Sequence, residues 1–88
     1  MASYITYSGT ITRLTVETKD KRPLFFAQQS YGDGKLRWGF RYLDEETSET
    51  TMTLTMIQLL RDAMASGWTV ELKIEGGTDK IFDVKVLK

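Results

Sequence analysis

The sequence predicts a mainly β domain: a small five-stranded barrel with one helix, in the chain order strand, strand, strand, helix, strand, strand. One segment, residues 55–66, has the apolar periodicity of a helix, and the segments on either side alternate apolar and polar side chains as strands do. The first strand-like segment is long, and its alternation changes phase, as expected of a strand that serves both halves of a small barrel. With 88 residues, the chain is expected to form a single domain, residues 1–88.

The first predicted strand covers residues 4–18 and must bury different faces along its length. Apolar residues up to Ile11 share one face, whereas Leu14 and Val16 fall on the other. A bulge or a strong bend within residues 9–13 would bring both sets to the core.

Residues 24–30 and 36–43 are the next two predicted strands, and a glycine-bounded hairpin turn joins them. The second of them alternates most regularly, with four large apolar side chains on one face: Leu36, Trp38, Phe40 and Tyr42. We expect this larger face to belong to the core. In that case the side chains on the opposite face that are exposed are Arg37 and Arg41. The alternative is that its aromatic side chains, with Phe25, Phe26 and Tyr31 of the neighbouring strand, form a binding face that stacks on bases or sugars.

An acidic stretch, residues 44–49, follows the third strand. It is predicted to be a solvated loop rather than a Ca²⁺ or Mg²⁺ site, because it lacks the glycine-punctuated ligand spacing of a calcium loop. Residues 50–55 then place Met52 and Leu54 in alternation and could add a short strand beside the third. The alternative architecture is therefore an antiparallel meander sheet packed on one helix.

The predicted helix at residues 55–66 has recognisable ends. Thr55 and Gln58 have the spacing of a capping box, and Gly67 suits a left-handed helix stop. The apolar stripe of this helix is broader than one end of a barrel requires. We therefore predict a subunit contact in a homo-oligomer through three of its residues: Met56, Leu59 and Ala63.

The last two predicted strands, residues 68–75 and 81–88, alternate regularly and are joined by a glycine turn at residues 76–80. Together with the bent first strand, the order of the elements resembles the oligonucleotide/oligosaccharide-binding fold, the OB-fold.

The second half of the chain is similar in spacing to the OB domains of toxin-type B subunits. The predicted helix ends in A-M-A-S-G and is followed by W-x-V-x-L-x-I, a glycine turn and I-x-x-V-x-V. The resemblance implies a pentameric ring with the helices towards its centre and glycan binding in a surface groove. The chain departs from secreted members of that family in lacking the cysteines for their disulfide.

Composition excludes several kinds of site. The chain has no Cys and no His, which removes disulfides, thiolate and imidazole metal ligands and the usual general base. No pair of carboxylates stands out for acid–base catalysis, so we predict that the protein is not an enzyme and uses no cofactor or metal. No apolar run approaches the roughly 20 residues of a membrane span. The N-terminus lacks the features of a secretory signal, which predicts a cytoplasmic chain, with a processed secreted form as the alternative.

Charges are balanced overall but unevenly placed. The net charge is zero, yet residues 1–43 carry seven basic and three acidic side chains, whereas residues 44–88 carry five basic and nine acidic ones. Folding can interleave the two halves. Otherwise the chain has a bipolar surface suited to head-to-tail packing of identical subunits.

These observations predict a noncatalytic binding module that acts as a homo-oligomer, with a glycan or a protein surface as its ligand. Its predicted ligand-binding residues are Arg37, Arg41, Phe25 and Tyr31. One alternative is an OB domain for single-stranded nucleic acid, which the neutral net charge disfavours because phosphates require a positive groove. The other is an oligomeric scaffold without a small ligand.

Overall fold

The computed structural model describes residues 3–43 and 47–87, and in the second range the side chains from residue 52 onward. Its elements are β1 (Tyr4–Lys19), β2 (Arg22–Tyr31), β3 (Lys35–Tyr42), α1 (Thr47–Ser66), β4 (Thr69–Glu75) and β5 (Ile81–Leu87). The predicted order of three strands, a helix and two strands is confirmed. Residues 44–46 of the predicted acidic loop lie outside the described residues.

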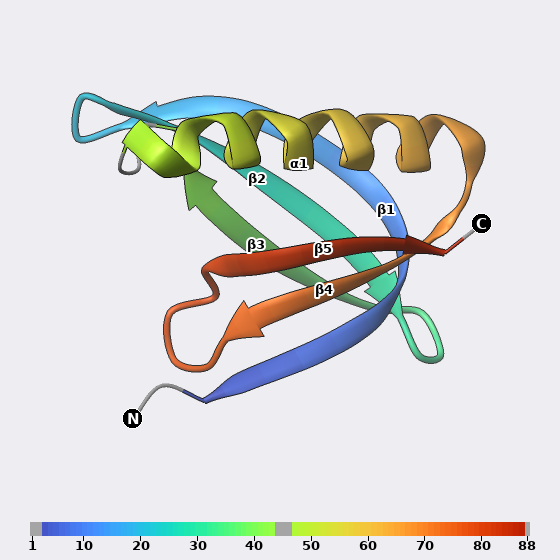
Figure 1. The fold of residues 1–88 in the computed structure, drawn as a ribbon. Coiled ribbons are helices and arrows are strands. Elements are labelled where there is room, and N and C mark those ends of the chain that lie inside the picture. The colour runs from blue at the N-terminus through green and yellow to red at the C-terminus, as the bar shows by residue number, and fades with distance from the viewer. Residues whose placement is uncertain (1–2, 44–46, 88) are drawn as a thin grey trace.

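All five strands belong to one antiparallel sheet, in the order β3-β2-β1-β4-β5. The sheet is strongly curled: in Figure 1, β4, β5 and the first half of β1 lie in front, β2 and β3 lie behind, and α1 runs across the top, with the second half of β1 passing behind it. The edge strands approach each other at one parallel bridge, where the backbone N–H of Phe40 donates to the carbonyl oxygen of Asp79 (3.1 Å). In the described part of the chain, the sheet is therefore not closed into a barrel.

The central strand, β1, pairs with both halves of the sheet. Its N-terminal half pairs with β4, its C-terminal half pairs with β2, and Gly9 pairs with both. A Cβ at Gly9 would overlap the carbonyl oxygen of Ser30, so this position requires glycine. Between Ile11 and Arg13 the pairing with β2 shifts by one residue, which confirms the predicted bulge. As a result, Leu14 packs against the same core as Ile11.

The helix α1 begins at Thr47, earlier than predicted, and Thr55 is therefore inside the helix and does not cap it. The predicted end is confirmed. Gly67 has a left-handed φ of 70°, and the N–H of Trp68 donates to the carbonyl oxygen of Ala63 (3.0 Å).

Residues 50–55 are helical, so the predicted short strand, and the four-stranded meander that depended on it, are wrong, although the chain does form an antiparallel sheet with one helix. The inward residue of this helical turn is Thr53, which is buried although it is polar. Met52 and Leu54, on either side of it, are both exposed. Met52 and Leu54 alternate as in a strand, but these residues are helical. The buried side of the helix continues through Thr53 to Met56.

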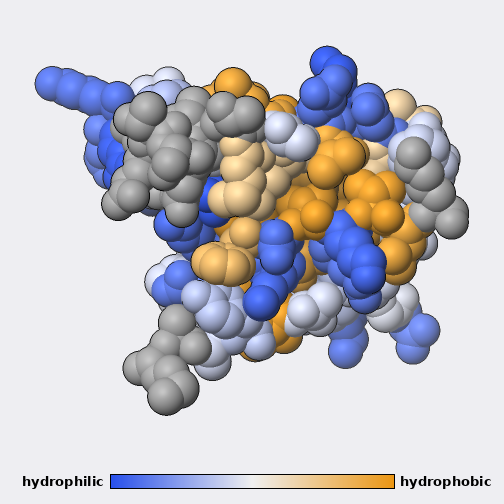
Figure 2. Space-filling model, viewed as in Figure 1, coloured by the Kyte–Doolittle hydropathy of each residue, from blue (hydrophilic) through white to orange (hydrophobic). Residues whose placement is uncertain are grey.

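The core lies between the two halves of the curled sheet and under α1. Its buried side chains come from the helix and four strands: Ile11, Phe25, Ala27, Met56, Leu60, Ala63, Val70, Leu72, Ile74 and Ile81. On the face shown in Figure 2, hydrophobic side chains also gather in the strip between α1 and β5. Val84 and Val86 of β5 are partly buried against the core.

The strand β3 turns its faces opposite to the prediction. Gly39 and Arg41 are buried, whereas Trp38 is 40% exposed. Arg41 can be buried because its guanidinium is hydrogen-bonded: Nε donates to the hydroxyl of Thr53 (2.7 Å), and Nη1 donates to the carbonyl oxygen of Ile81 (3.0 Å). The expectations that Arg41 is exposed and that the apolar face of this strand belongs to the core are both wrong.

Candidate functional site

Four aromatic side chains on the outer surface of β2 and β3 form what we call the aromatic face: Phe26, Trp38, Phe40 and Tyr42. The β2–β3 register places Phe26 directly opposite Phe40. Ring centroids are 6.1 Å apart for Phe26 and Trp38, 6.2 Å for Phe26 and Phe40, and 5.7 Å for Phe40 and Tyr42. The rings of β3 face outward because the residues between them point into the core.

Polar side chains of β1 border the aromatic face. In the β1–β2 register, Thr15 is opposite Phe26 and Glu17 is opposite Leu24. The hydroxyl of Thr15 donates to Oε2 of Glu17 (3.1 Å). This hydrogen bond orients the carboxylate, which has acceptor positions for further hydrogen bonds.

Glu17, Phe26 and Trp38 together line a shallow hollow of about 260 Å³. The ring planes of Phe26 and Trp38 are nearly perpendicular, at 88°. The hollow is smaller than the pockets of about 300–1,000 Å³ that enclose drug-sized ligands, so it suits one small group while the rest of a ligand lies on the surface. It combines two ring surfaces with one carboxylate.

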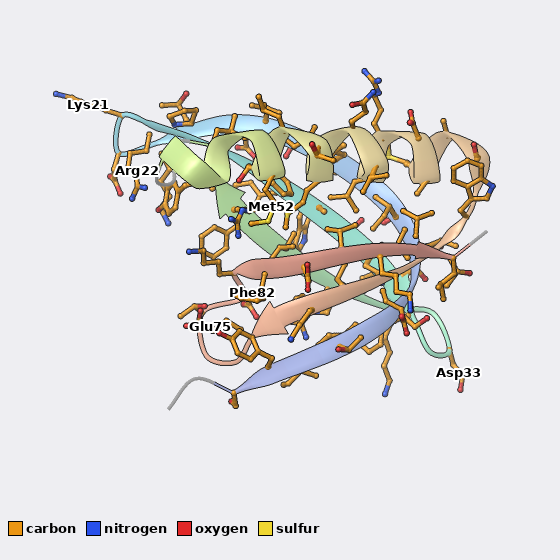
Figure 3. All side chains as sticks on the ribbon, viewed as in Figure 1. Lys21, Arg22, Asp33, Met52, Glu75 and Phe82 are labelled. Carbon is orange, nitrogen blue, oxygen red and sulfur yellow. The ribbon has the colours of Figure 1, made fainter. Side chains whose placement is uncertain are left out.

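Basic side chains lie at one end of the aromatic face. The guanidinium of Arg22 stacks on Tyr42, with Cζ 3.8 Å from the ring centroid. Lys21 extends from the adjacent β1–β2 turn, whereas Asp33 lies in the β2–β3 turn at the opposite end of the molecule (Figure 3). These basic residues therefore flank the aromatic face at its Tyr42 end.

Two of the four predicted ligand-binding residues are buried. Phe25 is fully buried in the core, and Arg41 is 2% exposed. The β2–β3 register places them opposite each other on the inner side of the sheet. Neither is available to a ligand on the surface.

The other two, Arg37 and Tyr31, meet at a third residue, Tyr7. The Cζ of Arg37 lies 3.9 Å from the ring centroid of Tyr7, and the ring centroid of Tyr31 lies 5.0 Å from it. Nη2 of Arg37 also donates to Oδ1 of Asp79 (2.7 Å), which compensates its charge. This pair lies apart from the hollow lined by Glu17, Phe26 and Trp38.

The predicted subunit contact is divided between the inside and the outside of α1. Met56 (4%) and Ala63 (0%) are buried in the core of the same chain, whereas Leu59 is 39% exposed. The apolar stripe is broad because α1 packs against β1, β4 and β5 at once. Leu59 is therefore the member of this set that a second subunit can reach.

A second hollow, of about 220 Å³, lies on the outer surface of β1, β4 and β5 and is lined by Thr6, Glu71, Lys73, Asp83, Val84 and Lys85. The β4–β5 register sets Glu71 opposite Lys85 and Lys73 opposite Asp83. Opposite charges in register compensate each other across a sheet. The lining of this second hollow is mostly charged, whereas the hollow of the aromatic face is lined mostly by aromatic rings.

Glu17 was not predicted for any site, and Phe26 and Trp38 were predicted only as part of the alternative to a core position, the aromatic binding face. One available signal was Gly39, because a glycine inside a strand often marks the close approach of another element. Here that element is β5, whose Ile81 packs against the backbone of β3. A buried Gly39 turns its neighbour Trp38 outward.

Comparison of the chain with protein-family models, with curated proteins and with solved structures finds no match. Within residues 3–43 and 47–87, no group of three potential metal ligands is placed to hold an ion. In the same residues, no helix is long and apolar enough to cross a membrane. The candidate site is therefore defined by its geometry.

Proposed function

We propose that the chain is a noncatalytic domain that binds a glycan on its aromatic face. One observation carries the proposal: the exposed ring of Trp38 lies beside Phe26 and Glu17 in one hollow. Aromatic rings stack on the apolar faces of sugar rings, and a carboxylate accepts hydrogen bonds from sugar hydroxyls. The rest of the glycan would continue over Phe40 and Tyr42.

The architecture supports this proposal. The strand order, with β3 and β5 approaching at one bridge, is the one expected of a partly open OB-like barrel, in which strands 2 and 3 carry the ligand surface. The aromatic face lies on these two strands. We therefore propose an OB-like fold, and the resemblance of the second half of the chain to toxin-type B subunits extends the proposal to a ring of identical subunits.

Self-association through α1 is the second part of the proposal. Among its described side chains, the helix exposes four large apolar ones: Met52 (43%), Leu54 (56%), Leu59 (39%) and Met64 (36%). Exposed apolar groups on one element suit a contact with another subunit. An oligomer that presents several weak sites would bind a multivalent glycan more tightly than one site does.

Single-stranded nucleic acid is the second candidate ligand, favoured by the basic residues at the Tyr42 end of the aromatic face. Bases stack on aromatic rings as sugars do, and Lys21 and Arg22 lie where they could contact phosphates. The carboxylate of Glu17 in the hollow opposes this candidate, because it repels a phosphate.

Isothermal titration calorimetry with oligosaccharides and with single-stranded oligonucleotides, each at low and high salt, tests the proposal. For uncharged oligosaccharides we expect binding that is insensitive to salt, lost in Trp38→Ala and kept in Tyr4→Ala. Tyr4 is the matched control because it is 41% exposed, as Trp38 is 40% exposed, in the half of β1 that pairs with β4.

Two other outcomes of this titration would contradict glycan binding. Oligonucleotide binding that weakens steeply with salt and is lost in Trp38→Ala would favour the second candidate. Binding of neither ligand would contradict both.

A further inference from the structure

The hollow of the aromatic face offers two ring surfaces to one small group. The rings of Phe26 and Trp38 stand at 88° with their centroids 6.1 Å apart, an edge-to-face contact, so a group in the corner that they form meets the face of one ring and the edge of the other. A cation within about 6 Å of a ring centroid is attracted by the negative face of the ring. The arrangement therefore suits an ammonium group better than an uncharged one.

Glu17 supplies a negative charge at the same place. Its carboxylate lines the hollow together with the two rings, and the hydrogen bond from Thr15 orients it. A carboxylate beside two aromatic rings attracts a cation and repels an anion. Arg13 and Lys19, which are also on β1, do not line the hollow.

Aromatic rings of this chain already hold cations in this way. Arg22 stacks over Tyr42 on the same face, and Arg37 stacks over Tyr7. Among the described residues, no cation of the chain is stacked on Phe26 or Trp38. Their faces are therefore available to a cation that a ligand brings.

We propose that the ligand is a glycan with unsubstituted amino groups, of the glucosamine type, and that one sugar ammonium enters this hollow. The inference rests on the glycan binding proposed above. The sugar ring lies on Trp38, and its ammonium contacts the ring of Phe26 and donates to the carboxylate of Glu17. N-acetylation removes the positive charge, and a carboxylated or sulfated sugar brings the opposite charge, so the hollow discriminates against both.

The test compares two oligosaccharides of equal length, one of glucosamine and one of N-acetylglucosamine, by isothermal titration calorimetry below the pKa of the sugar amine. We expect the glucosamine oligosaccharide to bind about tenfold more tightly. In Glu17→Gln this difference shrinks severalfold, because only the rings then attract the ammonium, while the affinity for the N-acetylated oligosaccharide is unchanged. Raising the pH through the pKa of the sugar amine removes the difference in the unaltered chain.

Glu71→Gln is the matched control, because Glu71 is a carboxylate that lines the hollow on the other outer surface. This variant is expected to keep the tenfold preference, which excludes a general attraction between cationic sugars and an acidic residue. Thermal unfolding of both variants verifies that they are folded.

Three outcomes would overturn the inference. Equal affinity of the unaltered chain for both oligosaccharides rejects the ammonium site and leaves glycan binding intact. A preference for glucosamine that is undiminished in Glu17→Gln rejects the hollow as its site. Binding of neither oligosaccharide rejects the proposed function together with the inference.

Discussion

Ile81 of β5 packs directly on the backbone of Gly39 in β3. A Cβ at Gly39 would lie 2.7 Å from Cγ1 of Ile81 and 3.0 Å from its Cδ1. Ile81 is fully buried, and its carbonyl oxygen accepts a hydrogen bond from Arg41. These contacts join the two edges of the open sheet, where the described strands form one bridge rather than a ladder.

Gly39→Ala is expected to lower the free energy of unfolding by about 1–3 kcal/mol, because Cγ1 of Ile81 can move aside only if this buried side chain changes its rotamer or β5 shifts. Chemical denaturation measures the loss. Ile81→Ala removes the obstructing atoms, so the double variant should lose less stability than the two single variants together. Additive losses would contradict a direct contact.

Arg41→Met is expected to lower the free energy of unfolding by about 2–4 kcal/mol, because it removes the guanidinium that donates to Thr53 and Ile81 inside the core. Arg37→Met is the control on the same strand. Its ion pair with Asp79 is more exposed, and the expected loss is below about 1.5 kcal/mol. If the two variants unfold at the same denaturant concentration, the buried Arg41 contributes no more to stability than Arg37, which contradicts this prediction.

Gly67→Ala is expected to cost about 1 kcal/mol, because the residue ends α1 with a φ of 70°. The space around it is open, since no atom lies within 4 Å of the position that a Cβ would take, so the cost is one of backbone conformation. Gly67→Asn should cost less, since asparagine tolerates the left-handed region. Thermal unfolding compares the two, and an equal loss would exclude this explanation.

Leu59→Lys is expected to reduce the mass measured by light scattering towards that of one chain, 10.1 kDa, if α1 forms the subunit contact. A charge placed among apolar side chains of an interface is costly to desolvate. Gln58→Lys, at the neighbouring exposed position, should leave the mass unchanged. A mass of one chain for the unaltered protein at every concentration removes the ring from the proposal.

The element order and the bulge of β1 could be predicted because both depend on local pattern. The apolar set that ends at Ile11 and the set that begins at Leu14 differ in phase, and a single shift of register packs Leu14 against the same core as Ile11, while Ile5 (47%) and Val16 (59%) stay exposed. The change of phase can be recognised within the first strand, without knowing which residues it contacts. The end of α1 at Gly67 was predictable for the same reason.

The faces of β3 could not be predicted, because alternation shows which residues share a face but not which face is inside. That choice depends on Ile81, far along the chain, which needs the space left by Gly39. It depends also on Thr53, whose hydroxyl accepts from the buried Arg41. The sequence therefore left open whether Trp38 belongs to the core or to a binding face, since Trp38 follows the orientation of its strand.

The long-range pairing of β1 has a consequence for synthesis. Tyr4 lies opposite Glu75, so the first half of β1 finds its partner only when β4 has been made. Until then, a chain growing on the ribosome has an open strand edge with exposed N–H and C=O groups, the kind of edge on which chains associate. Nascent chains that stop before β4 should therefore be the most prone to aggregate. In the finished protein, the β4–β5 hairpin covers this edge of β1.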